Sequence, residues 1–283
     1  MSDKQVVVSG YATLDYVIEL AEPFHGTGTK TIRHRPHDDW PRAGGAALFA
    51  SRALARAGHG VSPVTWVGPG LGGAHYRAQC QEYGIDQDGV ALVPSGRTPT
   101  CVLTYQPGGD YGCLFDPGFS GDERLTDPQH RLIRRADLVC LAVGPPHLGG
   151  EILSLVRPDA VLAWIAKTDL TSYTPELRAA YAKRANYIFC NTAERAFVDD
   201  SFQHSRRPHQ VVFETQGRDG VVVDTGGDAT LVPARDVEAS DTTGAGDTLA
   251  GAALAALLAA PDALEDAARA GVAAARDLLL ERG

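Results

Sequence analysis

Short apolar runs rich in β-branched residues alternate along the chain with longer segments whose apolar residues recur at helical spacing. Strands are predicted over 6–8, 65–67, 138–143, 160–165, 187–190 and 211–213. Helices are predicted over 46–57, 74–83 and 148–156, another helix runs through Glu194, and two more begin at Thr248 and at Ala263. This alternation is typical of an α/β protein with a mainly parallel sheet and helices on both faces. Ligands bind at the carboxyl edge of such sheets.

Two segments interrupt the alternation and are predicted to be extended. They cover residues 13–35 and 98–115, and the second contains a turn sequence at 107–110 that predicts a hairpin. Another hairpin is expected over 221–232, turning at 226–228.

The composition favours a single globular domain over residues 1–283. The chain has 283 residues and is 44% hydrophobic, enough to bury a large core. A net charge of −9 argues against nucleic-acid or anionic-membrane partners, which require clustered Lys and Arg. No apolar run approaches the roughly 20 residues of a membrane span. The five cysteines are scattered, which indicates reduced thiols, and we expect a cytoplasmic protein.

The sequence Asp241-Thr242-Thr243-Gly244-Ala245-Gly246-Asp247 places a glycine-bearing turn and a carboxylate directly before an apolar, alanine-rich helix. The first backbone N–H groups of a helix lack intrahelical partners and, with the helix dipole, attract phosphate. A lone aspartate there would ordinarily be an N-cap. The combination of a carboxylate with a glycine turn indicates instead an anion site with a base beside it.

These seven residues resemble, at every position, the strongest motif of the ribokinase-like (PfkB-type) carbohydrate kinases. The resemblance extends from about Val6 to about Ala275, and it implies a three-layer α/β/α sandwich with a small β-sheet lid formed by the segments 13–35 and 98–115. It also implies ATP and Mg²⁺ as cofactors. By resemblance, Asp247 is the catalytic base, and the backbone of Gly244, Ala245 and Gly246 forms the anion hole.

Two further motifs follow the family's order on the nucleotide side. Asn191 and Glu194 match N-x-x-E, whose side chains act near Mg²⁺ and the phosphates, largely through water. The same pair has the spacing of a capping box, and both roles can coexist. Thr215, Gly217 and Gly220 match T-x-G-x-x-G, which borders the nucleotide in the family.

By analogy with several family members, a monovalent cation such as K⁺ is expected near Asp241 and Thr243, and Thr243 is counted with the nucleotide-binding residues. No Walker P-loop is present in the sequence, so nucleotide phosphates must be held in another way.

The acceptor side is expected near the beginning of the chain. Asp15 matches the family aspartate that binds sugar hydroxyls, and a carboxylate can accept two such donors. Gly44 and Gly45 match a double glycine that lets the backbone approach the acceptor. Phe49 stands where the family has Asn, which replaces a polar ligand by an apolar or stacking surface.

Two other patterns have simpler explanations. The stretch 68–73 reads G-x-G-x-x-G, the spacing of a dinucleotide fingerprint, but it does not open the first βαβ unit and lacks the acidic residue at the end of the next strand. It also resembles the family's V-G-x-D-x-x-G turn, with Gly70 in place of Asp. The cluster at 34–39 is interrupted by Pro36, so a solvated loop is expected there.

The sequence thus predicts a kinase that transfers the γ-phosphoryl group of ATP to a hydroxymethyl group of a sugar or sugar derivative. A nucleoside kinase of the same fold, a non-catalytic ligand-binding relative and a dehydrogenase remain as alternatives. The apolar lid strands suggest a homodimer formed through the lid.

Overall fold

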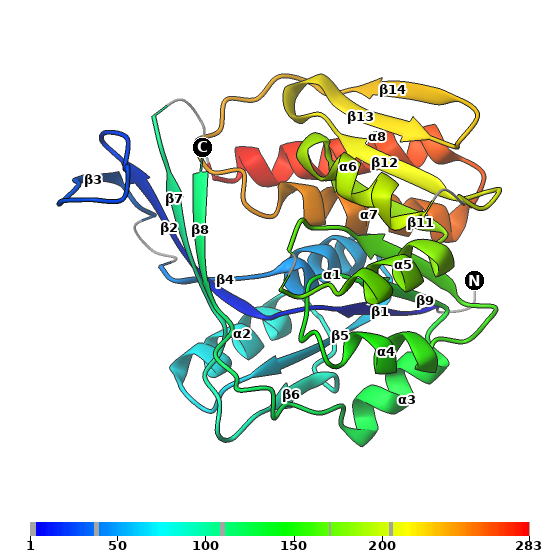
Figure 1. The fold of residues 1–283 in the computed structure, drawn as a ribbon, viewed down its shortest axis with the longest axis horizontal. Helices are drawn as coiled ribbons and strands as arrows, with labels where there is room; N and C mark the ends of the chain where they lie inside the picture. Colours follow the sequence, from blue (N-terminus) through cyan, green and yellow to red (C-terminus); the bar gives the residue numbers. More distant parts are fainter. Residues whose placement is uncertain (1–3, 37–39, 108–110, 170, 204–205, 283) are drawn as a thin grey trace.

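The structure, a computed structural model, describes residues 4–36, 40–107, 111–169, 171–203 and 206–282 (Figure 1). The elements are, in order, β1 (Gln5–Ser9), β2 (Thr13–Leu20), β3 (Ile32–His34), β4 (Arg42–Gly44), α1 (Ala46–Arg56), β5 (Gly60–Val67), α2 (Leu71–Glu82), β6 (Val90–Leu92), β7 (Thr100–Tyr105), β8 (Tyr111–Asp116), α3 (Asp127–Arg135), β9 (Leu138–Leu141), α4 (Gly149–Leu155), β10 (Val161–Ile165), α5 (Pro175–Arg184), β11 (Tyr187–Asn191), α6 (Thr192–Ser201), β12 (Val211–Thr215), η1 (Gly217–Asp219), β13 (Gly220–Asp224), β14 (Ala229–Pro233), α7 (Ala245–Ala259) and α8 (Leu264–Leu280).

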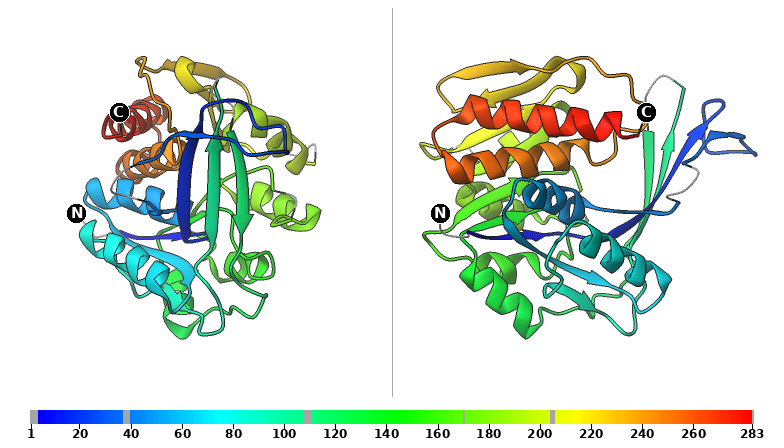
Figure 2. Two further views of the ribbon diagram at one scale, coloured as in Figure 1. Left: turned by 90° about the vertical axis from the view of Figure 1, so that its left-hand side faces the viewer. Right: turned by 180° about the vertical axis from the view of Figure 1, so that it is seen from behind.

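The main sheet has the order β14-β13-β12-β11-β10-β9-β1-β5-β6, and its strands run parallel from β12 to β6. Strands β13 and β14, the last two along the chain, form the hairpin expected over 221–232. Strand β13 pairs antiparallel with both β12 and β14. Helices α3 to α6 cover one face, and α1, α2, α7 and α8 cover the other (Figures 1 and 2). Burial on both faces explains why strands such as β9 are apolar throughout. The three-layer α/β/α prediction is confirmed.

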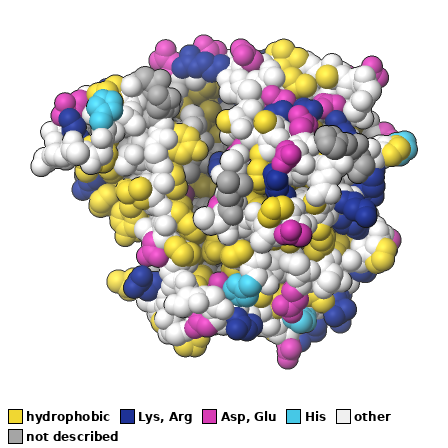
Figure 3. Space-filling view, in the orientation of Figure 1, with side chains coloured by type: hydrophobic (Ala, Val, Ile, Leu, Met, Phe, Trp, Pro, Cys, Tyr) yellow, Lys and Arg dark blue, Asp and Glu magenta, His cyan; other side chains and the backbone are white. Residues whose placement is uncertain are grey.

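A smaller sheet stands at one end of the molecule (Figure 1). Its strands have the order β3-β2-β7-β8, and β4 also pairs with β2. The expected hairpin of 98–115 corresponds to the antiparallel pair β7 and β8, although residues 108–110 of its turn lie outside the described residues. Hydrophobic side chains gather along this lid sheet and where it joins the body (Figure 3). Only three residues, 10–12, separate β2 from strand β1 of the main sheet.

Helices α1, α7 and α8 pack closely because glycine lies at their contacts. A Cβ atom on Gly251 of α7 would come within 2.4 Å of the Ala50 carbonyl oxygen on α1, and one on Gly271 of α8 within 2.8 Å of the Leu249 carbonyl oxygen. Helix α7 begins at Ala245, so Gly246 lies in its first turn. Within the described ranges, no helix combines the length and apolar character needed to cross a bilayer.

Candidate active site

The N-terminus of α7 lies after the long connection from β14, and a left-handed glycine starts it. Gly244 has φ 76° and is the N-cap residue, while the Ala245 N–H donates to the Thr242 carbonyl oxygen at 3.2 Å. A side chain at Gly244 would be strained by this φ, and its Cβ would lie 2.5 Å from the ring of Phe49. The backbone conformation of this loop and its packing against Phe49 therefore both require glycine at this position.

Asp247 lies in the first turn of α7 and is partly exposed. Burial raises the pKa of its carboxyl group, the charge of Lys167 opposes this rise, and Glu194 adds to it. A carboxylate with a raised pKa is a stronger base, which suits proton abstraction from a hydroxyl group.

Lys167 lies just beyond β10, and the sequence analysis did not identify it. Its Nζ is 3.3 Å from Glu194 Oε1. Burial disfavours the ammonium form, but Glu194, Tyr111 and Asp247 outweigh this effect and raise the pKa of Lys167. A positive charge is thus held beside both Glu194 and Asp247.

Asn191 and Glu194 form a complete capping box at the start of α6. Asn191 Oδ1 accepts from the Glu194 N–H, and Glu194 Oε2 accepts from the Asn191 N–H, both at 2.9 Å. Glu194 is buried, and its other oxygen faces Lys167. Among the described residues no group of three or more His, Cys, Asp or Glu side chains is arranged to enclose a metal ion. This donor set fits a Mg²⁺ ion that keeps most of its waters better than a protein cage.

The T-x-G-x-x-G residues lie next to this capping box. Thr215 ends β12 and is in register with Asn191 at the end of β11. Gly217 and Gly220 have φ values of 59° and 119°, and a Cβ on Gly220 would approach the Val232 carbonyl oxygen to 2.1 Å. Both glycines are therefore required by the backbone geometry of the turn, whatever ligand it borders.

The acceptor-side residues meet at the base of the lid. Asp15 is 3% exposed, and Thr13 Oγ1 donates to its Oδ1 at 2.6 Å. Burial raises the pKa of Asp15 to about 6, the Thr13 hydrogen bond and Arg42 oppose the rise, and nearby Asp241 and Asp247 add to it. The carboxylates at the two ends of the predicted site thus influence each other.

The double glycine is explained by close backbone packing in the same region. Gly44 lies opposite Thr13 in the β2–β4 pair, and a Cβ there would lie 2.0 Å from Asp15 Oδ2. Gly45, with φ 87°, caps α1, and a Cβ on it would come 2.2 Å from the Tyr11 carbonyl oxygen. These contacts allow Asp15 to lie against backbone.

Phe49 is 3% exposed and packs against the loop that precedes α7. Its ring contacts Gly244, and the guanidinium carbons of Arg42 and Arg282 lie 6.0 Å and 5.4 Å from its centroid. Little of the ring is left for an acceptor to contact. The predicted stacking surface is in this structure a packing surface for the loop before α7.

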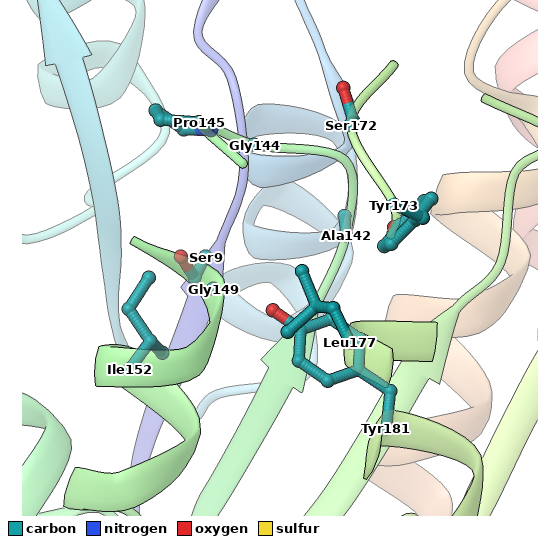
Figure 4. A pocket seen from close by; sticks show the side chains of 10 residues that line it. All are labelled: Ser9, Ala142, Gly144, Pro145, Gly149, Ile152, Ser172, Tyr173, Leu177 and Tyr181. Carbon is teal, nitrogen blue, oxygen red and sulfur yellow. The ribbon is translucent and has the colours of Figure 1, made fainter. Parts of the chain in front are cut away.

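Two glycines of the G-x-G-x-x-G stretch lie at close backbone contacts. A Cβ on Gly68 would meet Arg97 backbone at 2.7 Å, and one on Gly73 would meet the Gly68 carbonyl oxygen at 2.1 Å. A small cavity elsewhere lies among Ser9, Ala142, Tyr173 and Tyr181 (Figure 4), and Asp247 does not line it. Neither feature adds a catalytic group to the site.

The site thus combines a helix N-terminus, which can bind a phosphate group, with a carboxylate in the first turn of that helix and a lysine beside it. The model of the pfkB family carbohydrate kinases matches residues 3–283, and the chain belongs to this family. It is thus an ATP-dependent kinase, which removes the support for a dehydrogenase.

The chain is similar to an ATP-dependent ribose-1-phosphate kinase from Halopiger xanaduensis. The two sequences are 27% identical over 260 residues, and the alignment covers 87% of this chain and 82% of that protein. A nucleoside kinase from Methanothermobacter thermautotrophicus is 26% identical over 256 residues, with 87% and 80% covered. Among solved structures, the Burkholderia thailandensis nucleoside kinase in complex with inosine has a TM-score of 0.80 at 16% identity, covering 98% and 92% of the two chains. Ribokinase from Cryptococcus neoformans in complex with ADP has a TM-score of 0.79 at 18% identity, covering 98% and 94%. These structures share the fold.

Proposed function

We propose that this protein transfers the γ-phosphoryl group of ATP to a hydroxymethyl group of a sugar or sugar derivative, with Asp247 as the base. The observation that carries the proposal is the position of Asp247 in the first turn of α7, with a raised pKa and with Lys167 and Glu194 beside it. Phosphoryl transfer depends mainly on alignment and charge stabilisation, and this arrangement supplies both.

In the proposed reaction, the Asp247 carboxylate takes the proton of the acceptor hydroxyl group. The hydroxyl oxygen forms a bond to the γ-phosphorus, the bond from that phosphorus to the β–γ bridging oxygen breaks, and ADP leaves. The N–H groups of Gly244, Ala245 and Gly246 stabilise negative charge on the transferring group. Bound Mg²⁺, held through water by Asn191 and Glu194, would supply further charge neutralisation.

Lys167 has two roles in this proposal. Its ammonium group lies within reach of the phosphates that Asp247 and Glu194 would face, so it can offset their charge. It also opposes the rise in the pKa of Asp247, which keeps more of that base ionised at neutral pH.

Asp15 is the proposed acceptor ligand. Its buried carboxyl group lies at the base of the lid, and Thr13 fixes one of its oxygens. An acceptor hydroxyl group that donates to the other oxygen would be aligned relative to Asp247.

A nucleoside acceptor is the second candidate, and an aromatic pair supports it. The rings of Tyr11 and Phe115 are 5.1 Å apart, and Phe115 belongs to lid strand β8 and is 39% exposed. Such rings offer a surface on which a nucleobase can stack. A relative from Methanothermobacter thermautotrophicus is named as a nucleoside kinase, which is consistent with this candidate.

The test is ADP release from Mg·ATP with pentoses, hexoses, their amino, deoxy and 1-phosphate derivatives, and nucleosides as acceptors. We expect sugar-dependent turnover, and Asp247→Asn should lower kcat at least ~10²-fold while ATP affinity is roughly kept. Asp236→Asn, at a side chain that is 73% exposed, is the matched control and should be fully active. Turnover with nucleosides alone would favour the second candidate, and normal turnover by Asp247→Asn would refute the role of Asp247.

A further inference from the structure

Two arginines far apart in the sequence meet at the loop that precedes the anion hole. Arg42, on β4, donates from Nη1 to Asp241 Oδ2 at 2.8 Å. Arg282, just beyond the end of α8, donates from Nη1 to the Thr243 carbonyl oxygen, and the same nitrogen is 3.7 Å from Asp241 Oδ2. Each of the three charged side chains is only 14% exposed. The charges are therefore largely shielded from screening by solvent ions.

The oxygens around which a monovalent cation was expected are already used by these protein groups. Asp241 Oδ2 and the Thr243 carbonyl oxygen accept from the two arginines, and Asp241 Oδ1 accepts from the Thr243 N–H at 2.9 Å. The Thr243 hydroxyl group hydrogen-bonds the Tyr105 hydroxyl group, from lid strand β7, at 2.9 Å. A potassium ion here would compete for these oxygens and would lie beside two positive charges. The residues present do not fit such an ion.

Packing against Phe49 holds the two guanidinium groups in this position. Both lie over the ring of Phe49, which is itself packed against Gly244. Burial and the neighbouring Arg42 lower the pKa of Arg282 to about 10, so it remains protonated at neutral pH. The group of two arginines and Asp241 thus carries a net positive charge directly beside the loop that is proposed to bind the transferring phosphoryl group.

We propose that Arg282, together with Arg42, acts as a built-in cation that fixes the 241–244 loop and makes phosphoryl transfer independent of monovalent cations. Arg282 is a positioning residue in this proposal, because it touches the loop and not the reacting atoms. The proposal rests on the proposed kinase function, since it concerns the loop that forms the anion hole. It also gives a reason for Phe49, whose apolar ring supports both arginines and Gly244 at once.

The first test uses the unmodified protein. With the best acceptor, the rate is measured while KCl replaces tetramethylammonium chloride at ~100 mM and fixed ionic strength, so that screening stays constant. We expect the rate to change by less than about 2-fold. Stimulation of about 10-fold or more by K⁺ would overturn the proposal while leaving the kinase function intact. Absence of transfer to every acceptor in every salt would instead count against the proposed function.

Variants separate positioning from general stability. Arg282→Ala should lose about 10–100-fold in kcat, and K⁺ or about 20 mM guanidinium, far below unfolding concentrations, should restore part of it. Arg282→Lys should retain more activity because it keeps the charge. Arg269→Ala is the control, since Arg269 lies on α8, the helix that ends just before Arg282, with its side chain 55% exposed. Wild-type kcat in Arg282→Ala, or a loss that neither ion restores, would overturn the proposal.

A binding measurement gives the same answer without turnover. The thermal midpoint is compared in KCl and in tetramethylammonium chloride at equal ionic strength. We expect no K⁺-specific shift for the wild-type protein and a rise of a few degrees for Arg282→Ala, because an ion that binds only the folded state stabilises it. A K⁺-specific rise in the wild-type protein would show that its cation site is open, contrary to the proposal.

Discussion

Replacing Asp15 by Asn is expected to stabilise the protein while weakening acceptor binding. The carboxyl group of Asp15 is 3% exposed, and its pKa of about 6 compares with an ordinary value of 3.8. This difference corresponds to ~3 kcal/mol by which the folded state disfavours the ionised form at neutral pH. Asn keeps the shape and can accept the Thr13 hydrogen bond, but its NH₂ group also needs a partner. We therefore expect a gain of about 1–3 kcal/mol in the free energy of unfolding at pH 8.

The pH dependence gives this prediction its sharpest test. Because the folded pKa lies above the unfolded value, the folded state binds more protons between pH 3.8 and about 6, and the free energy of unfolding contributed by Asp15 falls as the pH rises through that range. The difference between Asp15→Asn and wild type should therefore be near zero at or below pH ~4 and reach its full value above pH ~7. Urea unfolding at several pH values measures it. A difference independent of pH, or an Asn variant less stable at pH 8, would refute the reasoning.

Three further predictions concern separate parts of the molecule. Glu194→Gln keeps the capping box but loses the charge, so half-maximal velocity should require about 3–10-fold more Mg²⁺, whereas an unchanged requirement would leave Glu194 with only its capping role. The hydrogen bond from Cys101 lowers the pKa of the exposed Cys113 thiol to about 7. Mass spectrometry after brief iodoacetamide treatment at pH 7.5 should therefore find Cys113 labelled well before buried Cys80, and equal labelling of the two would contradict this prediction. If the lid forms a homodimer, Leu114→Glu, at a residue 70% exposed, should shift sedimentation from dimer to monomer, and a monomeric wild type would contradict it.

The main sheet could be predicted because its signal is local. Strands β5, β9 and β11 each contain an apolar run and are each followed by a helix that the sequence also predicts, namely α2, α4 and α6. Strand β5 was predicted too short, from residue 65 instead of Gly60, because Ser62 and Pro63 interrupt the apolar run. Helix α3 was not predicted, since its only fully buried residues are Gln129 and Ile133 and most of its other residues are charged or polar.

The candidate site was predictable only where several of its residues are contiguous. The motif ending at Asp247 is one turn and one helix start, so it can be recognised from its contiguous residues and their resemblance to the family motif. Lys167 is a single lysine after a strand, and nothing nearby in the sequence indicates that it meets Glu194. Arg42 and Asp241 are brought together only by the tertiary fold, because lid strand β4 and the loop before α7 are distant in sequence. Such contacts have no local signature.

The separation of the proposed acceptor residues from the proposed nucleotide residues along the chain has an evolutionary consequence. Asp15 and Gly44 lie on strands at the beginning of the chain, whereas the groups proposed to handle phosphate follow residue 166. Mutation or recombination in the first third of the gene can therefore alter the choice of acceptor while leaving the residues proposed to bind phosphate unchanged. The pair of Arg42 with Asp241 is one exception, because it joins the two regions, and a change at either residue needs a compensating change at the other. Changes in substrate range are thus expected to arise at other positions, with Arg42 and Asp241 both retained.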